Sequence, residues 1–151
     1  MCSSDLTLHT NTAVGAVTRL RDMGVEPFLL SSTLLGVLAQ RLVRLLCAAC
    51  KRVGPASERE KALLGLDEDV DLCHPVGCPA CSHTGYHGRT GIYELLLIDE
   101  AVRNLIHAEA SEAEIERAAR KRTTSIRRDA KRRLLAGDTS VEEVLRVTRL
   151  E

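Results

Sequence analysis

The sequence of 151 residues contains no tryptophan, one phenylalanine and two tyrosines. Proteins that bind single-stranded nucleic acid stack its bases on aromatic side chains, so this scarcity argues against nucleic acid as a partner. The formal net charge is zero. Any attraction to an anionic surface must therefore come from a local cluster of basic residues.

Long apolar segments are also absent. The longest candidate, residues 28–46, is interrupted by serine, threonine, glutamine and arginine, whereas a membrane span needs roughly 20 apolar residues. The N-terminus lacks the basic-then-apolar layout of a signal peptide, and residues 1–6 are interpreted as a non-native scar. We expect a cytosolic protein, in which the six cysteines are metal ligands or free thiols rather than disulfides.

Capping residues predict the helices of the first part of the chain. Asn11 or Thr12 begins a helix that runs to about Met23, where a glycine ends it. Pro27 suits the first turn of a second helix. This helix is expected to run to about Leu46. Because its residues are apolar on most sides, it is expected to be buried or at an interface.

The rest of the chain is predicted to contain one strand and several short helices. Residues 89–98 read as the strand, and Asp99 begins a helix directly after it. Three Ser-x-x-Glu capping boxes begin further helices. Glycines are expected to end two of these helices. The boxes are Ser57 with Glu60, Ser111 with Glu114 and Ser140 with Glu143, and the glycines are Gly65 and Gly137.

Two Cys-x-x-Cys pairs carry the strongest chemical signal. Cys47 and Cys50 form one pair, and Cys78 and Cys81 form the other. Two residues between thiols let one backbone turn direct both sulfurs at one tetrahedral ion, and nearby glycine and proline allow that turn. The sequence therefore predicts a structural Zn²⁺ with four thiolate ligands. A redox Cys-x-x-Cys and a pair of disulfides are the alternatives.

Other potential ligands lie close to these pairs. Cys73 does not keep the two-residue spacing and is interpreted as a spare thiol. His74 could compete as a ligand, whereas His83 and His87 are interpreted as loop or surface residues. Four thiolates already complete the tetrahedral shell, which argues against a catalytic role for the metal.

Five segments, in the same order along the chain, resemble the ATPases of bacterial secretion systems. The resemblance is strongest to the GspE-type ATPases of type II secretion, with the type IV pilus assembly ATPases as the alternative. Residues 7–13 (TLHTNTA) resemble the His box of that family. The other matching segments are residues 19–35 with 39–46, the two cysteine pairs, residues 85–95 (GYHGRTGIYEL) and residues 144–148.

The resemblance implies an α/β fold: an α-rich C-terminal fragment of a RecA-type P-loop ATPase domain, with an inserted zinc-binding subdomain and a C-terminal helical bundle. The expected regions are residues 7–46 for the ATPase core, 47–89 for the zinc insert and 90–151 for a strand and helices. The full-length protein would be a homohexamer on the cytoplasmic face of the inner membrane. It would use ATP and Mg²⁺ to drive pseudopilus assembly and would bind a GspL-type platform protein.

The resemblance also assigns candidate roles. His9 would sense the γ-phosphate of ATP, and Arg41 and Arg19 would contact nucleotide or a neighbouring subunit. Taken without the resemblance, His9 is a plain structural residue and the arginines extend to solvent. The sequence departs from the family because it contains no G-x-x-x-x-G-K-[ST] motif. We therefore expect this chain alone not to hydrolyse ATP.

Two features leave further alternatives open. Residues 117–133 contain nine lysines or arginines and one aspartate, which could bind anionic lipid or form a solvated helical surface. The cysteine pairs would also suit a free-standing zinc-ribbon adaptor or a thiol redox module.

Glu94 is expected to have a structural role, paired with Arg89 or with a helix terminus.

Overall fold

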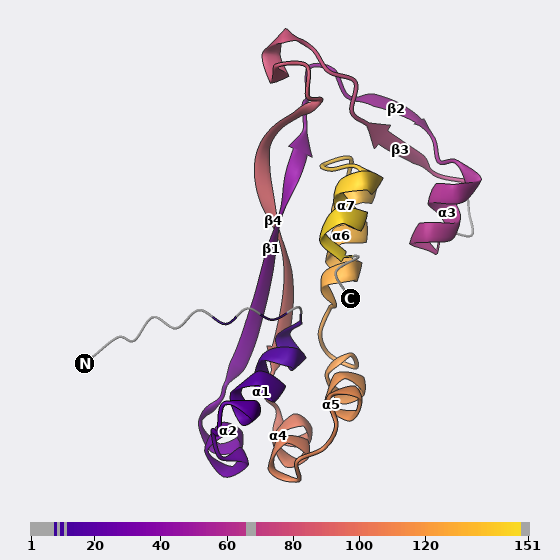
Figure 1. Ribbon diagram of the computed structural model, residues 1–151. Coiled ribbons are helices and arrows are strands. Elements are labelled where there is room, and N and C mark those ends of the chain that lie inside the picture. The colour runs from indigo at the N-terminus through magenta and orange to yellow at the C-terminus, as the bar shows by residue number, and fades with distance from the viewer. Residues whose placement is uncertain (1–7, 9, 11, 66–68, 149–151) are drawn as a thin grey trace. The chain divides into compact units, whose positions relative to one another are not determined.

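The computed structural model describes residues 8, 10, 12–65 and 69–148 (Figure 1). These residues form a mixed α/β structure with two antiparallel strand pairs, β1 with β4 and β2 with β3. Its elements are α1 (Ala13–Asp22), α2 (Pro27–Thr33), β1 (Gly36–Leu46), β2 (Arg52–Pro55), α3 (Glu58–Leu64), β3 (Asp71–His74), the 3₁₀ turn η1 (Pro79–Cys81), β4 (Tyr86–Leu97), α4 (Glu100–His107), α5 (Glu112–Ala119), α6 (Ile126–Leu135) and α7 (Val141–Thr148).

The chain forms two compact units, each with its own core. Among the described residues, unit 1 contains those up to 39 and those from 94 to 125, and unit 2 contains those from 40 to 93 and those from 126 to 148. The chain passes between them inside β1, inside β4 and before α6. No helix in the described part of the chain is both long and apolar enough to cross a membrane.

The first helix confirms the capping prediction. The Thr12 side chain accepts a hydrogen bond from Gly15 N at 2.9 Å, which satisfies one of the free N–H groups at the start of α1. Gly24 follows the helix with φ +86°, the left-handed conformation expected for a residue that ends it. Pro27 lies in the first turn of α2, as predicted.

The predicted helix from Pro27 to Leu46 is wrong. Helix α2 ends at Thr33, and residues 36–46 form strand β1, which pairs with β4 (Figure 1). Val37 and Ala39 pack against the core of unit 1, whereas Leu38 between them is exposed. This alternation has the period of a strand. A short apolar run with leucine at many positions does not distinguish a buried helix from a strand, and Gly36 was the signal for a break.

Unit 1 packs four helices against its portions of β1 and β4. Glu94, on β4 and only 1% exposed, accepts hydrogen bonds from Ala13 N and from Arg120 Nη2, each at 3.2 Å. Glu94 thus binds a helix terminus, one of the two partners predicted for it. The buried core residues are Ala13, Val14, Val17, Leu30, Leu96, Ile98, Val102, Ile106, Ile115 and Ala119.

Unit 2 has a second apolar core and carries the cysteine pairs. Strands β2 and β3 pair with Val53 opposite Cys73, and the Ser57 and Glu60 capping box begins α3 as predicted. Gly65 ends that helix at φ +56°. The buried core residues are Val43, Ala56, Leu72, Ile92, Ile126, Ala130, Leu134, Val141, Val144 and Val147.

The C-terminal capping predictions have mixed outcomes. Asp99 caps α4, and Ser111 with Glu114 forms a reciprocal box at α5, both as predicted. At α7, Glu143 N donates to Ser140 Oγ at 3.4 Å, but the Glu143 carboxylate is bound by Arg44 and Arg146. Gly137, with φ +72°, follows α6.

Candidate metal centre

The four paired cysteines meet at one point in unit 2. The sulfurs of Cys47, Cys50, Cys78 and Cys81 all lie within 4.8 Å of one another. The Sγ–Sγ distances are 4.0 Å between Cys47 and Cys78, 3.9 Å between Cys50 and Cys81, and 3.8 Å between Cys78 and Cys81. Two pairs separated in sequence by residues 51–77 thus form one cluster, as the spacing predicted.

Two tight turns place these sulfurs. In the first, Cys50 N and Lys51 N both donate to the Cys47 carbonyl, at 3.1 and 2.9 Å. In the second, Pro79 begins the 3₁₀ turn between the other two cysteines. Cys47 N also donates to Gly85 O at 2.9 Å, which joins the turns.

Glycine is required on both sides of the second turn. Gly77 and Gly85 have φ values of +103° and +79°. A Cβ atom on Gly85 would lie 2.5 Å from Pro75 Cβ, and one on Gly77 would lie 2.6 Å from the His83 carbonyl oxygen. A larger residue at either position would force the turn apart and move the second cysteine pair.

Backbone N–H groups point at two of the sulfurs. Cys78 N and Gly85 N each donate to Cys81 Sγ at 3.2 Å, and Gly77 N donates to Cys50 Sγ at 3.4 Å. Such donors stabilise thiolates and orient ligands around a metal. The sequence suggested this feature through its glycines and proline, and the structure confirms it.

Two of the thiols, Cys50 and Cys81, have pKa values shifted in opposite directions. Burial raises the pKa of Cys81, but hydrogen bonds from Cys78 N and Gly85 N outweigh it and lower the pKa to about 6. Burial raises the pKa of Cys50 to about 11, and hydrogen bonds to the neighbouring thiols add to the rise against the lowering effect of Gly77 N. A cation that binds all four sulfurs must displace the remaining protons, so its binding depends on pH.

The cluster has the dimensions of a tetrahedral thiolate site. With metal–sulfur bonds of about 2.3 Å, as Zn²⁺ makes with cysteine, neighbouring sulfurs lie about 3.8 Å apart. The three Sγ–Sγ distances given above are within a few tenths of an ångström of this value. Two of the ligands are buried and two are half-buried. The four residues therefore fit a metal ion with a closed protein shell.

Comparison with known protein families gives one match that covers nearly the whole chain. Residues 3–146 match the family described as Type II/IV secretion system protein. The chain belongs to this family. The match includes both cysteine pairs and nearly all of the described elements.

Curated relatives agree with the family match. The chain is 60% identical over 145 residues to the type II secretion system protein E of Aeromonas hydrophila, and 60% over 147 residues to that of Pseudomonas aeruginosa. It is 57% identical over 145 residues to the type II secretion system ATPase E of Vibrio cholerae. These alignments cover 95% to 96% of this chain but 29% of each relative. The chain thus spans less than a third of the length of these relatives.

The structure describes two of the three remaining candidate residues, Arg19 and Arg41. His9 lies outside the described residues. Arg19 is an exposed residue in the last turn of α1 in unit 1. Arg41 and Arg44 were expected on one side of a helix but lie on strand β1. Arg41 Nη1 donates to Val147 O near the end of α7 at 2.6 Å.

Cys73 and the three histidines near the cysteine pairs are not part of the cluster of four sulfurs. Cys73 lies on β3, outside the cluster of four sulfurs, as predicted. The Nδ1 atom of His74 is 3.8 Å from a Glu60 carboxylate oxygen. His83 and His87 are exposed, in agreement with their interpretation as surface residues.

The structure shows an ion-pair network in unit 2 that the sequence did not reveal. Glu143, only 1% exposed, accepts hydrogen bonds from the backbone and guanidinium of Arg44 and from the guanidinium of Arg146. Arg44 also stacks 4.0 Å from the centroid of the Tyr86 ring, whose hydroxyl bonds Ser140 at 2.7 Å. Residues 44 and 143 are far apart in sequence, and no local motif connects them.

Proposed function

We propose that this chain is the zinc-bearing C-terminal part of a type II secretion ATPase. The observation that carries the proposal is a closed cage of four thiols in a chain 57% to 60% identical to type II secretion E proteins. A bound Zn²⁺ would join the two cysteine turns and supply no open coordination position for chemistry. The type II relatives favour this assignment over the pilus ATPases and over a free-standing adaptor.

The full-length protein, in this proposal, is a RecA-type ATPase that drives pseudopilus assembly. It works as a homohexamer at the cytoplasmic face of the inner membrane and binds a GspL-type platform protein. The proposal keeps the three regions expected from the sequence. Residues 7–46 belong to the ATPase core, residues 47–89 form the zinc insert, and residues 90–151 form the strand and the helical bundle. The P-loop that binds ATP and Mg²⁺ belongs to the remainder of the full-length protein, because these 151 residues contain no such motif.

Three residues have proposed roles toward nucleotide in the full-length protein. His9 would sense the γ-phosphate, and Arg41 and Arg19 would contact phosphate or an adjacent subunit. Replacement of Arg41 by glutamine in the full-length enzyme is expected to lower ATPase activity with little change in zinc content. Unchanged activity would limit Arg41 to its contact with α7.

Contact of the basic residues 117–133 with anionic lipid is a further part of the proposal. Five basic residues of the 117–133 cluster already form hydrogen bonds or ion pairs within the chain: Arg120, Arg122, Lys131, Arg132 and Arg133. Much of the cluster's charge is therefore compensated locally. Sedimentation with anionic liposomes at low and high salt tests whether the uncompensated charge of the cluster binds lipid. Lipid contact predicts binding that weakens at high salt.

Elemental analysis tests the metal assignment directly. Protein purified under reducing conditions should contain one zinc per chain, and Cys78→Ser should lose it. A metal-free but folded wild-type chain would instead favour the thiol redox module. In the full-length enzyme, Cys78→Ser should abolish secretion while sparing nucleotide chemistry. A phosphate-release assay on the 151-residue chain should detect no ATP turnover.

A further inference from the structure

The turn that precedes α7 is attached to the segments that carry both cysteine pairs. Residues 137–140 lie between α6 and α7, and we call them the 137–140 turn. Each of these four consecutive residues is hydrogen bonded to a residue that flanks the cluster of four sulfurs. The partners of residues 137, 138, 139 and 140 are, in that order, Lys51, Leu46, Arg44 and Tyr86. All of these residues belong to unit 2.

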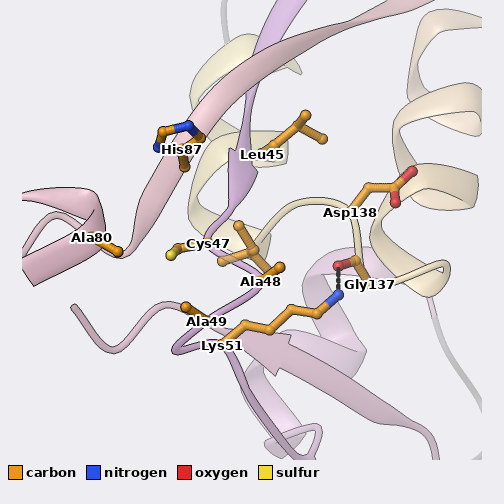
Figure 2. A pocket seen from close by; sticks show the side chains of 10 residues that line it. Leu45, Cys47, Ala48, Ala49, Lys51, Ala80, His87, Gly137 and Asp138 are labelled. Atoms are coloured by element: carbon orange, nitrogen blue, oxygen red, sulfur yellow. Dashed lines mark hydrogen bonds between the residues drawn. The ribbon is translucent and has the colours of Figure 1, made fainter. Parts of the chain in front are cut away.

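The first cysteine pair is held on both sides. Leu46, which directly precedes the pair, donates its N–H to Asp138 O at 2.8 Å. Lys51, which directly follows the pair, donates from Nζ to Gly137 O at 2.8 Å, and Figure 2 shows its side chain extending to that carbonyl group. The two bonds therefore fix the first cysteine turn against the 137–140 turn.

The second cysteine pair is reached through Tyr86. The Tyr86 hydroxyl lies 2.7 Å from Ser140 Oγ, at hydrogen-bond distance. Tyr86 directly follows Gly85, whose N–H donates to Cys81 Sγ at 3.2 Å and whose carbonyl accepts from Cys47 N at 2.9 Å. A displacement of Tyr86 would thus move a backbone unit that contacts both cysteine turns.

The 137–140 turn also begins α7. Ser140, only 2% exposed, accepts a hydrogen bond at Oγ from Glu143 N in the first turn of α7, at 3.4 Å. Near the other end of α7, Val147 O accepts from Arg41 Nη1 at 2.6 Å. The same turn therefore connects the cysteine segments to α7, and α7 leads to Arg41, for which a role toward nucleotide is proposed above.

We propose that metal binding by the four thiols and the docking of α7 are coupled through the 137–140 turn, so that each favours the other. This inference rests on the proposed metal site. Tyr86 and Ser140 contribute no ligand and would act as positioning residues for the two cysteine turns. Because such coupling is reciprocal, α7 and the carbonyl that Arg41 binds would be held more firmly in the metal-loaded chain.

The Zn²⁺ affinity of the reduced chain, measured by competition with a chromophoric chelator, tests this coupling. Tyr86→Phe removes only the hydroxyl that bonds Ser140, and it should weaken Zn²⁺ binding about three- to tenfold, as expected for one net hydrogen bond. In a Ser140→Ala background the same change should have no further effect, because the bond is already absent. Tyr93→Phe, at a more exposed tyrosine of the same strand, is the matched control and should leave the affinity unchanged.

A second control separates positioning of the cysteines from a general loss of stability. Ile126→Val lies at the start of α6 in the core of unit 2 and should destabilise that core. Its Zn²⁺ affinity should nevertheless stay within about twofold of the wild-type value. An equal loss of affinity in Ile126→Val and Tyr86→Phe would overturn the proposal. So would an unchanged affinity of Tyr86→Phe, or an equal effect of this substitution with and without Ser140.

Amide hydrogen exchange tests the reciprocal effect on α7. Removal of the metal with a chelator should speed exchange at residues 145–148 by about tenfold or more, while the amides of α4 in unit 1 should not change. Unchanged exchange in α7 would overturn the coupling and leave the metal assignment intact. A reduced chain that binds no Zn²⁺ would overturn both.

Discussion

The buried Glu143 carboxylate should make unit 2 sensitive to acid in a way that one substitution can isolate. Burial opposes its charge, but hydrogen bonds from Arg146 and Arg44 outweigh that effect and lower its pKa from 4.5 to about 2. The folded state therefore binds this proton more weakly than the unfolded state does. Since a tenfold change in proton affinity is worth about 1.4 kcal/mol, the ionised group stabilises unit 2 by about 3 kcal/mol at neutral pH.

The sign of the effect follows from the lowered pKa. The stabilisation is complete above the unfolded value of 4.5 and is lost as the pH falls toward 2. Glu143→Gln keeps the shape of the side chain and removes the charge. It should cost about 3 kcal/mol near pH 7 and only about 1.5 kcal/mol near pH 3, because by then much of the wild-type advantage has been lost.

Urea unfolding followed by NMR signals of unit 2 measures this difference. Val43 and Val144, both buried in its core, provide suitable methyl signals. Glu142→Gln is the matched control, because Glu142 is the exposed neighbour on the same helix. Acid also protonates the thiolates and releases metal, but it does so in both variants. Equal costs for the two substitutions, or a Glu143→Gln cost that does not change with pH, would refute the reasoning.

Three further predictions follow from the same contacts. Gly137→Ala should destabilise unit 2 by about 1–2 kcal/mol in urea unfolding, because the Gly137 φ is +72° and the new Cβ would lie 2.9 Å from Cys73 Sγ. Adding Cys73→Ala should recover part of this loss of stability, and no recovery would contradict the clash. Glu94→Gln should destabilise unit 1 by about 1–3 kcal/mol, which is more than Glu116→Gln should cost, because Glu116 is the more exposed partner of the same residue, Arg120. Equal costs would contradict a role for the buried carboxylate. Chelation of the metal should remove NMR signal dispersion from the two cysteine turns while the core signals of unit 1 persist, and loss of both together would contradict two separate cores.

Local chemistry made much of the structure predictable from the sequence. The Ser57 and Ser111 capping boxes and the Asp99 cap are formed by residues three apart, and the structure has all three. Their hydrogen bonds involve only neighbours, so no knowledge of the remaining fold is needed. Gly24 and Gly65 were also predictable as helix ends, because each adopts a positive φ that glycine accommodates without any distant partner.

Features that depend on distant partners were missed or misread. The sequence predicts a helix where strand β1 forms, because leucines fill both faces of the segment and only its pairing with β4 selects the extended form. The sequence predicts Glu143 as half of a local capping box, whereas Arg44 binds its carboxylate in the structure. The division into two units is likewise invisible locally, because the chain changes unit in the middle of two strands.

The cysteine cluster is the exception, because it joins distant residues and was still predictable. A tetrahedral ion needs four thiolates, and each Cys-x-x-Cys turn supplies only two, so the chemistry itself requires the second pair. The segment between the two cysteine pairs buries few apolar side chains. Helix α3 has no buried residue, and the described part of the segment contributes two buried apolar side chains, Ala56 and Leu72. With so little apolar burial to offset the entropy of ordering its described residues, a metal bound by the four thiolates would supply much of the stability of this segment.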